Sequence, residues 1–222
     1  MNAGRALTVT DRDSLERDGY LLVPSLLDQA VLGRLRSHLD ELVHQTVAAW
    51  DDDPEQATPE PGVVRVKLGA DDRDFAPCHD HPLLADAATA VLRPDWHVSG
   101  LLLRAPVPGY GGQGLHPDFA ERRTRGAWQT LSAMWCISAF TPDNGPLRVI
   151  PGSHRVSEPP IDMSARGSGM VPHPDEGKIV APAGSLILFN SADLWHSGTQ
   201  NDSSAPRLAL TTGFAPGRSP CR

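Results

Sequence analysis

The sequence has no long apolar run and no excess of positive charge. Nowhere in its 222 residues do about 18 uncharged apolar residues follow one another, as a membrane-spanning helix requires. The opening MNAGRALTVTDRD also lacks the apolar core of a signal peptide. The 27 acidic residues outnumber the 20 lysines and arginines, which gives a net charge of −7. We therefore expect a cytoplasmic protein that binds neither nucleic acid nor a membrane surface.

Cysteine is scarce as well. Cys78, Cys136 and Cys221 are odd in number and irregularly spaced, so they fit neither a disulfide framework nor a zinc ribbon. We expect reduced thiols. Cys78 stands in CHDHP beside His79 and His81. Side chains in so short a Pro-flanked loop rarely converge on one ion, so we interpret this segment as a polar surface turn.

Glycine and proline are abundant, with 20 and 21 residues. Many turns between short elements are indicated, which favours a β-rich fold over a helical bundle. Several short apolar runs have β-type composition and are separated by Gly, Pro, Asn and Asp: GVVRVKLG, VSGLLLRAPV, TLSAMWCISAF, KIVAPAG, SLILFNS and RLALTTGF. This spacing predicts an antiparallel sandwich or barrel. We expect one domain over 1–222, with N-terminal helices at about 10–47 and the β core at about 62–216.

The helices precede the β core. Thr10 and Asp13 have the spacing of a capping box for a short helix that Gly19 ends. A second, longer helix follows Asp28, with apolar residues at three- and four-residue steps. The acidic, Pro-rich stretch from Trp50 to Pro61 has no periodicity, and we interpret it as an exposed loop that contributes little to function.

The segment LHPDF carries the first chemical signal. If it is extended, side chains two residues apart point to the same face, so His116 and Asp118 face one ion while Pro117 points away. Pro117 cannot donate a ladder hydrogen bond, which places the segment at a strand end or edge. Alone, the tripeptide His-x-Asp is weak evidence for a metal site, because it occurs often by chance and also fits a surface salt bridge.

A second signal lies eighty residues further on, at His196. An apolar run, His196, a polar turn and Arg207 at the start of another run predict a β-hairpin that brings His196 and Arg207 into one cavity. Two imidazoles and one carboxylate on one face of an ion suit non-haem Fe(II) oxygenases, because three coordination positions stay open. A 2-oxo acid fills two of them and O2 the third, and arginine is well matched to the far carboxylate of that acid.

These residues carry a family resemblance. HPDF at 116–119, DNGPLRVIPGSHR at 143–155 and the eleven-residue step from His196 to Arg207 resemble the phytanoyl-CoA dioxygenase family of 2-oxoglutarate-dependent oxygenases. The resemblance implies a mainly β fold with flanking helices, a cupin-like double-stranded β-helix or jelly roll. It also implies that His116, Asp118 and His196 hold Fe(II), and that Arg207 binds the C5 carboxylate of 2-oxoglutarate.

Two positions depart from the family's pattern. Many relatives have Gln between the first two ligands and Ser two residues after the distal histidine, where this chain has Pro117 and Gly198. Some hydrogen bonds to the co-substrate then come from elsewhere. The candidates are Thr199, Ser197, Trp135 and Gln129, with Trp135 equally compatible with core packing. Lys67 or Arg65 is a further candidate, since some relatives have a basic residue upstream, and at least one of the two is expected to be a surface charge.

Asp118 bears on the reaction. Related halogenases have a small residue in place of this carboxylate, so Asp118 favours hydroxylation, although relatives divert the same chemistry to desaturation, epimerisation or ring closure. Two other classes stay open. Arg207 speaks against a cupin-type metalloenzyme that works without 2-oxoglutarate, and the intact triad speaks against a non-catalytic binding protein.

The sequence says least about the substrate. We expect a small free metabolite, an intermediate of specialised metabolism, rather than a large acyl-CoA. Arg122 and Arg123 follow the first two ligands and are candidates for attracting an anionic substrate, with a solvated loop as the alternative. Met163 lies in an aperiodic segment that is the best lid candidate. Monomer and homodimer both stay open.

Overall fold

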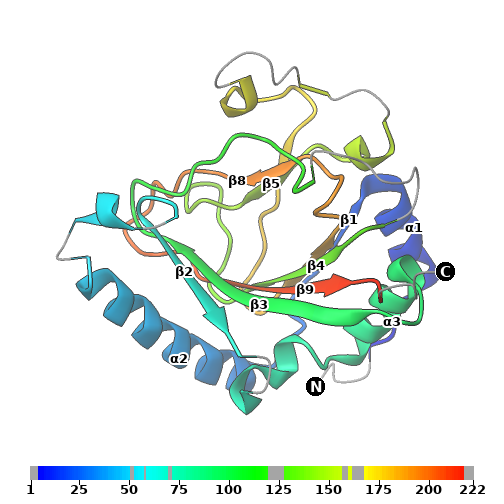
Figure 1. The fold of residues 1–222 in the computed structure, drawn as a ribbon, viewed down its shortest axis with the longest axis horizontal. Coiled ribbons are helices and arrows are strands. Elements are labelled where there is room, and N and C mark those ends of the chain that lie inside the picture. The colour runs from blue at the N-terminus through cyan, green and yellow to red at the C-terminus, as the bar shows by residue number, and fades with distance from the viewer. Residues whose placement is uncertain are drawn as a thin grey trace.

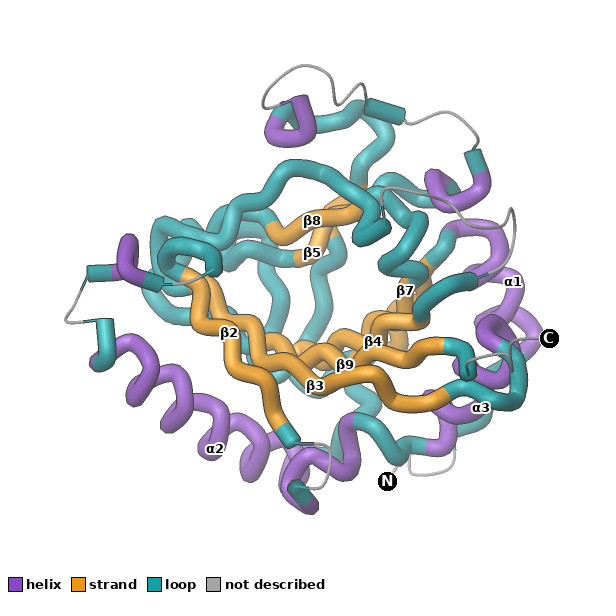
Figure 2. The backbone as a smooth tube through the Cα atoms, in the orientation of Figure 1, coloured by secondary structure: helices purple, strands orange, loops and turns teal. Residues whose placement is uncertain are grey.

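Two antiparallel sheets lie on opposite sides of a common interior (Figure 2) in the computed structural model of the protein. The structure describes residues 5–50, 53–57, 59–69, 72–119, 128–156, 160–161 and 168–217. The large sheet has the order β1 (Tyr20–Val23), β7 (Leu186–Phe189), β4 (Leu131–Cys136), β9 (Ala209–Ala215), β3 (His97–Pro106) and β2 (Val63–Leu68). The small sheet has the order β6 (Gly177–Lys178), β5 (Leu147–Val149) and β8 (His196–Gly198). The mainly β, jelly-roll prediction is confirmed.

The helices cover the outside of the large sheet. They are α1 (Val9–Asp18), α2 (Gln29–Ala48) and α3 (Pro82–Leu92). The loops contain the 3-10 turns η1 (Pro54–Gln56), η2 (Arg73–Cys78), η3 (Ser153–Arg155) and η4 (Ser168–Met170). Figure 1 shows α2 running along the face of β2 and β3 that is turned away from the small sheet. Its buried stripe is Leu32, Leu35, Leu39 and Val43, the three- and four-residue spacing of one helix face. No helix in the described ranges is long and apolar enough to cross a membrane.

The helix ends follow from local hydrogen bonds. Asp28 caps α2 through its carboxylate, which accepts from the backbone N–H of Val31 at 2.9 Å. Gly19 ends α1 in the left-handed conformation at φ +80°, as its sequence position predicted. The capping box of α1 is formed by Thr8 and Asp11, not by Thr10 and Asp13. Both pairs have the required spacing. In the pair that forms, the Asp11 carboxylate also accepts a hydrogen bond from the guanidinium of Arg5.

Alternation along the strands of the large sheet separates a helix-side core from the interior between the sheets. On β3, Leu101, Leu103 and Ala105 are buried in the helix-side core. The intervening Leu102 and Arg104 line the interior cavity instead. An arginine on the inner face of a sheet therefore comes directly from strand parity.

Arg148 ties the small sheet to the loops above it. This side chain is only 5% exposed. Its Nε donates to the hydroxyl of Ser197 at 2.7 Å, and its Nη1 pairs with Glu176 at 2.9 Å. Its Nη2 donates to the carbonyls of Gln113 and Gly169, both at 3.0 Å. The arginine of the DNGPLRVIPGSHR motif thus fixes β8 and two loops at once.

Two further local predictions are wrong. Cys78 is not part of a surface turn: it is fully buried at the end of η2, and its carbonyl accepts from Trp135 and Thr212. His196 and Arg207 are not joined by a β-hairpin, because β8 belongs to the small sheet and β9 to the large one. Asn201 shapes the crossing between them, since its side-chain amide donates to the carbonyl of Pro106 at 2.9 Å.

Candidate metal centre

His116, Asp118 and His196 lie together between the two sheets. One potential ligand atom from each lies within 4.8 Å of the others. The two histidines face each other in an isolated antiparallel bridge, with both backbone hydrogen bonds at 3.0 Å. The Asp118 carboxylate lies 3.9 Å from Nε2 of His116 and 3.8 Å from Nε2 of His196. Ligands eighty residues apart in the sequence are therefore brought together by one bridge.

Backbone carbonyls fix the protonation of both rings. Nδ1 of His116 lies 2.6 Å from the carbonyl of Gly114, and Nδ1 of His196 lies 2.8 Å from that of Leu194. A carbonyl only accepts, so each Nδ1 carries the hydrogen and each Nε2 keeps a free lone pair. The Phe189 ring packs edge-on against His196 at a centroid distance of 5.0 Å. Both rings are thus oriented to bind one cation through Nε2.

The site is closed on one side and open on the other. His196 is buried, and this burial lowers its imidazole pKa, which favours the neutral form that binds metals. The side chains of His116 and Asp118 are 36% and 46% exposed. Any molecule that approaches the ion therefore arrives from the side of these two ligands.

Two buried guanidiniums line the same cavity, which encloses about 210 Å³. Nε and Nη1 of Arg207 and Nε of Arg104 are buried without a hydrogen-bond partner among the described residues. Arg207 also lies 4.6 Å from the centroid of the Phe140 ring. Burial, together with the nearby charge of Arg104, lowers the pKa of Arg207 to about 9. A buried cation with unused donors fits an anionic ligand.

Glu60 is the counter-ion that the sequence did not indicate. Its carboxylate accepts from Nη2 of Arg104 at 2.5 Å and lies 3.4 Å from Nη1 of Arg65. The expectation that the stretch from Trp50 to Pro61 contributes little to the site is therefore wrong. Arg104 itself had a signal, since the run LLLRAPV places an arginine among apolar strand residues. Glu60 had none, because its segment has no periodicity.

The predicted co-substrate contacts divide into those at the cavity and those away from it. Arg207 lines the cavity, whereas Trp135, Thr199 and Gln129 do not. Trp135 is fully buried on the helix side, where its indole donates to Cys78. Its strand neighbours Ser132 and Met134 line the cavity instead, so Trp135 is on the wrong face of β4 for a co-substrate contact.

Other candidates have different outcomes. The Thr199 hydroxyl donates to the carbonyl of Pro146 at 3.0 Å, which assigns it to loop structure. The Ser197 hydroxyl is taken by Arg148. The substrate candidates Arg122, Arg123 and Met163 lie outside the described residues.

A two-histidine, one-carboxylate site between the sheets of a jelly roll defines a class, the non-haem iron oxygenases. The chain matches the family model described as phytanoyl-CoA dioxygenase (PhyH) over residues 15–209. It therefore belongs to the phytanoyl-CoA dioxygenase family of Fe(II)- and 2-oxoglutarate-dependent oxygenases, as its motifs predicted.

The named relatives have low sequence identity to this chain. The chain is 27% identical over 238 residues to an ectoine dioxygenase of Bordetella parapertussis, covering 91% of this chain and 73% of that protein. The fold resembles HygX from Streptomyces hygroscopicus, solved with nickel and 2-oxoglutarate, with a TM-score of 0.72 and 20% identity over 96% of this chain and 88% of HygX. It also resembles the epimerase SnoN from nogalamycin biosynthesis, with a TM-score of 0.66 and 20% identity over 92% and 79% of the two chains. These structures support the fold.

Proposed function

We propose that this protein is an Fe(II)- and 2-oxoglutarate-dependent dioxygenase that hydroxylates a small-molecule metabolite. The observation that carries the proposal is the position of Arg207. Its unpaired, buried N–H groups line the same cavity as His116, Asp118 and His196. A metal triad beside a buried guanidinium suits a dicarboxylate that chelates the metal at one end and pairs with the arginine at the other.

The residues fit iron and its co-substrate. His116, Asp118 and His196 would hold Fe(II), and Arg207 would take the C5 carboxylate of 2-oxoglutarate. When bound, Fe(II) and 2-oxoglutarate couple the reduction of O2 to loss of CO2, which gives succinate and a hydroxylated product. The ring-to-carbonyl hydrogen bonds keep both Nε2 atoms aimed at the metal, so that less reorganisation is needed on binding.

Arg104 supplies a second cation for the co-substrate. Its Nη1 lies next to Gly198, 3.0 Å from where a Cβ of that residue would be. Many relatives have a serine at this position. Glu60 holds its Nη2, which leaves other N–H groups directed at the cavity. We assign to this guanidinium the hydrogen bonds that the missing serine would make, because a charged donor is stronger than a hydroxyl.

Hydroxylation is favoured over halogenation because the Asp118 carboxylate occupies the ligand position that a halide would need. Epimerisation is the second candidate, since the chain shares its fold with SnoN, whose described activity is epimerisation. Both outcomes begin with removal of a hydrogen atom from the substrate. They differ in whether oxygen is then added.

Succinate formation from 2-oxoglutarate tests the proposal. We expect slow, Fe(II)- and O2-dependent succinate and CO2 production by the full chain without added substrate when ascorbate is present, because ascorbate supplies the two electrons that a substrate would otherwise give. His116→Ala should abolish it. His97→Ala should leave it unchanged, because His97 is exposed at the start of β3 and does not line the cavity. Absence of Fe(II)-dependent succinate from the intact protein at saturating 2-oxoglutarate would contradict the proposal.

A further inference from the structure

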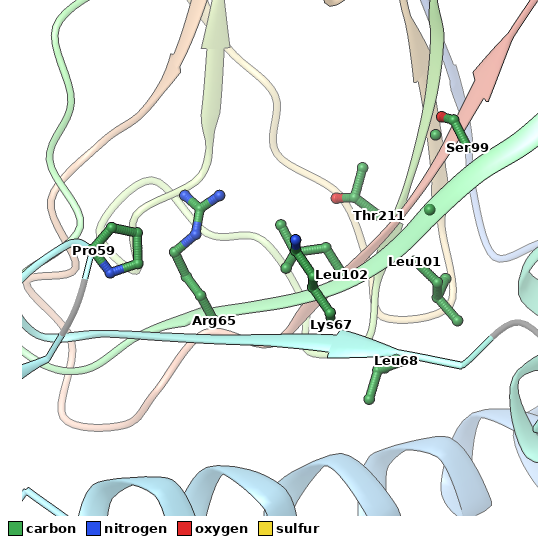
Figure 3. A pocket seen from close by; sticks show the side chains of 10 residues that line it. Pro59, Arg65, Lys67, Leu68, Ser99, Leu101, Leu102 and Thr211 are labelled. Carbon is green, nitrogen blue, oxygen red and sulfur yellow. The ribbon is translucent and has the colours of Figure 1, made fainter.

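A groove of about 550 Å³ runs across β2, β3 and β9 beside the metal site. Arg65, Leu102 and Thr211 line both this groove and the cavity that contains the triad, so the two spaces are adjacent. Figure 3 shows Arg65, Lys67 and Thr211 on the side of the sheet turned away from α2, whereas Leu68 points toward that helix. The groove is therefore an extension of the interior between the sheets.

Gly100 leaves part of the groove without a side chain. Gly100 on β3 and Gly213 on β9 are cross-strand partners. A Cβ on Gly100 would meet nothing within 4 Å, and its φ is outside the left-handed region. The backbone therefore does not require glycine there, and the residue's effect is open space. A β-irregularity between Val98 and Gly100 places Ser99 at the groove as well, and its hydroxyl lies over Gly213, 2.7 Å from where a Cβ of that glycine would be.

The groove is positively charged in a protein whose net charge is −7. Arg65 and Lys67 line it, and none of the described residues that line it is acidic. The Lys67 ammonium has no ion pair or hydrogen bond with the described part of the chain. Arg65 shares the Glu60 carboxylate with Arg104, and the Arg104 contact is the shorter one, 2.5 Å against 3.4 Å. Lys67 is thus available to a ligand, and Arg65 is held only by the longer of the two Glu60 contacts.

We propose that this groove is the substrate site and that it takes a flat molecule bearing a carboxylate. The planar part lies over Gly100 beside Leu102 and Ser99, and the carboxylate meets Lys67 and the forked guanidinium of Arg65. The co-substrate is assigned the other two cations of the cavity, Arg207 and Arg104, of which Arg104 is the cross-strand neighbour of Arg65. This inference rests on the proposed function and names the substrate class of the same site.

A matched pair of probes tests the charge requirement. The full chain is loaded with Mn(II), which is redox-inert here and paramagnetic, and with 2-oxoglutarate. Binding of 2-naphthoate and of its neutral analogue 2-naphthamide is then measured by calorimetry, and line broadening in the probe's NMR spectrum reports proximity to the metal. We expect the carboxylate to bind about tenfold more tightly than the amide and to be broadened. Lys67→Met should remove about half to most of that preference while leaving 2-oxoglutarate affinity unchanged.

A second variant tests whether the open space over Gly100 is needed for binding. Gly100→Leu should abolish binding of both probes and keep 2-oxoglutarate binding. Gly33→Leu is the matched control, since Gly33 is exposed on α2 and also has nothing within 4 Å of an added Cβ. Equal affinity for the two probes, no saturable naphthoate binding, or unchanged binding in Gly100→Leu would each overturn the inference. If these occur while succinate is still formed, the proposed function stands and only the substrate class is wrong.

Discussion

The guanidinium of Arg104 lies in the space that Gly198 leaves open. A Cβ at position 198 would be 3.0 Å from Nη1 of Arg104 and 3.1 Å from the carbonyl oxygen of Gly111. Arg104 cannot easily retreat, because Glu60 holds its Nη2 at 2.5 Å. Glycine at position 198 therefore makes room for the Arg104 guanidinium, and this charged donor takes the place of a side chain at position 198.

Gly198→Ser tests this relationship. We expect the added side chain to displace Arg104 and weaken 2-oxoglutarate binding about tenfold, with Fe(II) binding unchanged. Arg104→Met alone should weaken it similarly. In the double variant the serine has room, so the combined loss should be clearly smaller than the sum of the two single losses. Strictly additive losses in calorimetric titrations would show that the two positions are independent.

Arg207→Met separates binding from stability. The guanidinium is fully buried with unpaired donors, and an apolar side chain of similar length removes an uncompensated charge. We expect the free energy of unfolding without ligand to be unchanged or about 1 kcal/mol higher. The rise in melting temperature caused by 2-oxoglutarate should be lost. A variant that is strongly destabilised yet still stabilised by 2-oxoglutarate would place the arginine in the core rather than in the ligand site.

Arg148→Met should destabilise the protein. It breaks a buried network that joins Ser197, Glu176 and two loop carbonyls, so we expect a loss of about 3 kcal/mol in urea unfolding. Arg36→Met is the control, because Arg36 is 58% exposed in its pair with Asp40 and should cost less than about 1 kcal/mol. Equal effects of the two substitutions would contradict the role assigned to Arg148.

Cys78 and Cys136 should resist alkylation in the native protein. Both are fully buried, and burial raises the pKa of each thiol to about 12. A raised thiol pKa keeps the unreactive protonated form at pH 8, since only the thiolate attacks iodoacetamide. Mass spectrometry of a Cys221→Ser variant should show no modification without denaturant and two modifications with it. Rapid native labelling of either residue would show that the core opens there.

The metal ligands could be found from the sequence because their chemistry is local. His116 and Asp118 are two residues apart, and one β-bridge brings His196 opposite His116. Arg207 followed from the same reasoning, although the connection to it is not a hairpin. Arg207 comes close to His196 because the small sheet, which contains β8, faces the large sheet, which contains β9. Residues from both sheets line the cavity between them.

The wrong and missing parts have physical reasons. β4 is largely buried on both faces and has no clear alternation of apolar and polar residues, so the sequence does not show that Ser132 and Met134 face the cavity while Trp135 faces the helices. Glu60 meets Arg104 across 44 residues, and such long-range pairing leaves no periodic signal. The glycine pair at 100 and 213 becomes visible only when the strand register is known.

The central claim is that His116, Asp118, His196 and Arg207 form one site for Fe(II) chelated by 2-oxoglutarate. Anaerobic titration of the full chain with Fe(II) and then 2-oxoglutarate, followed by visible absorption, tests it most directly. We predict a weak visible charge-transfer band that appears only when both Fe(II) and 2-oxoglutarate are present, because the 2-oxo acid then chelates a facial-triad metal. His116→Ala should give no band, and Arg207→Met should require far more 2-oxoglutarate to reach the same absorbance. No band from the intact protein at saturating Fe(II) and 2-oxoglutarate would contradict the claim.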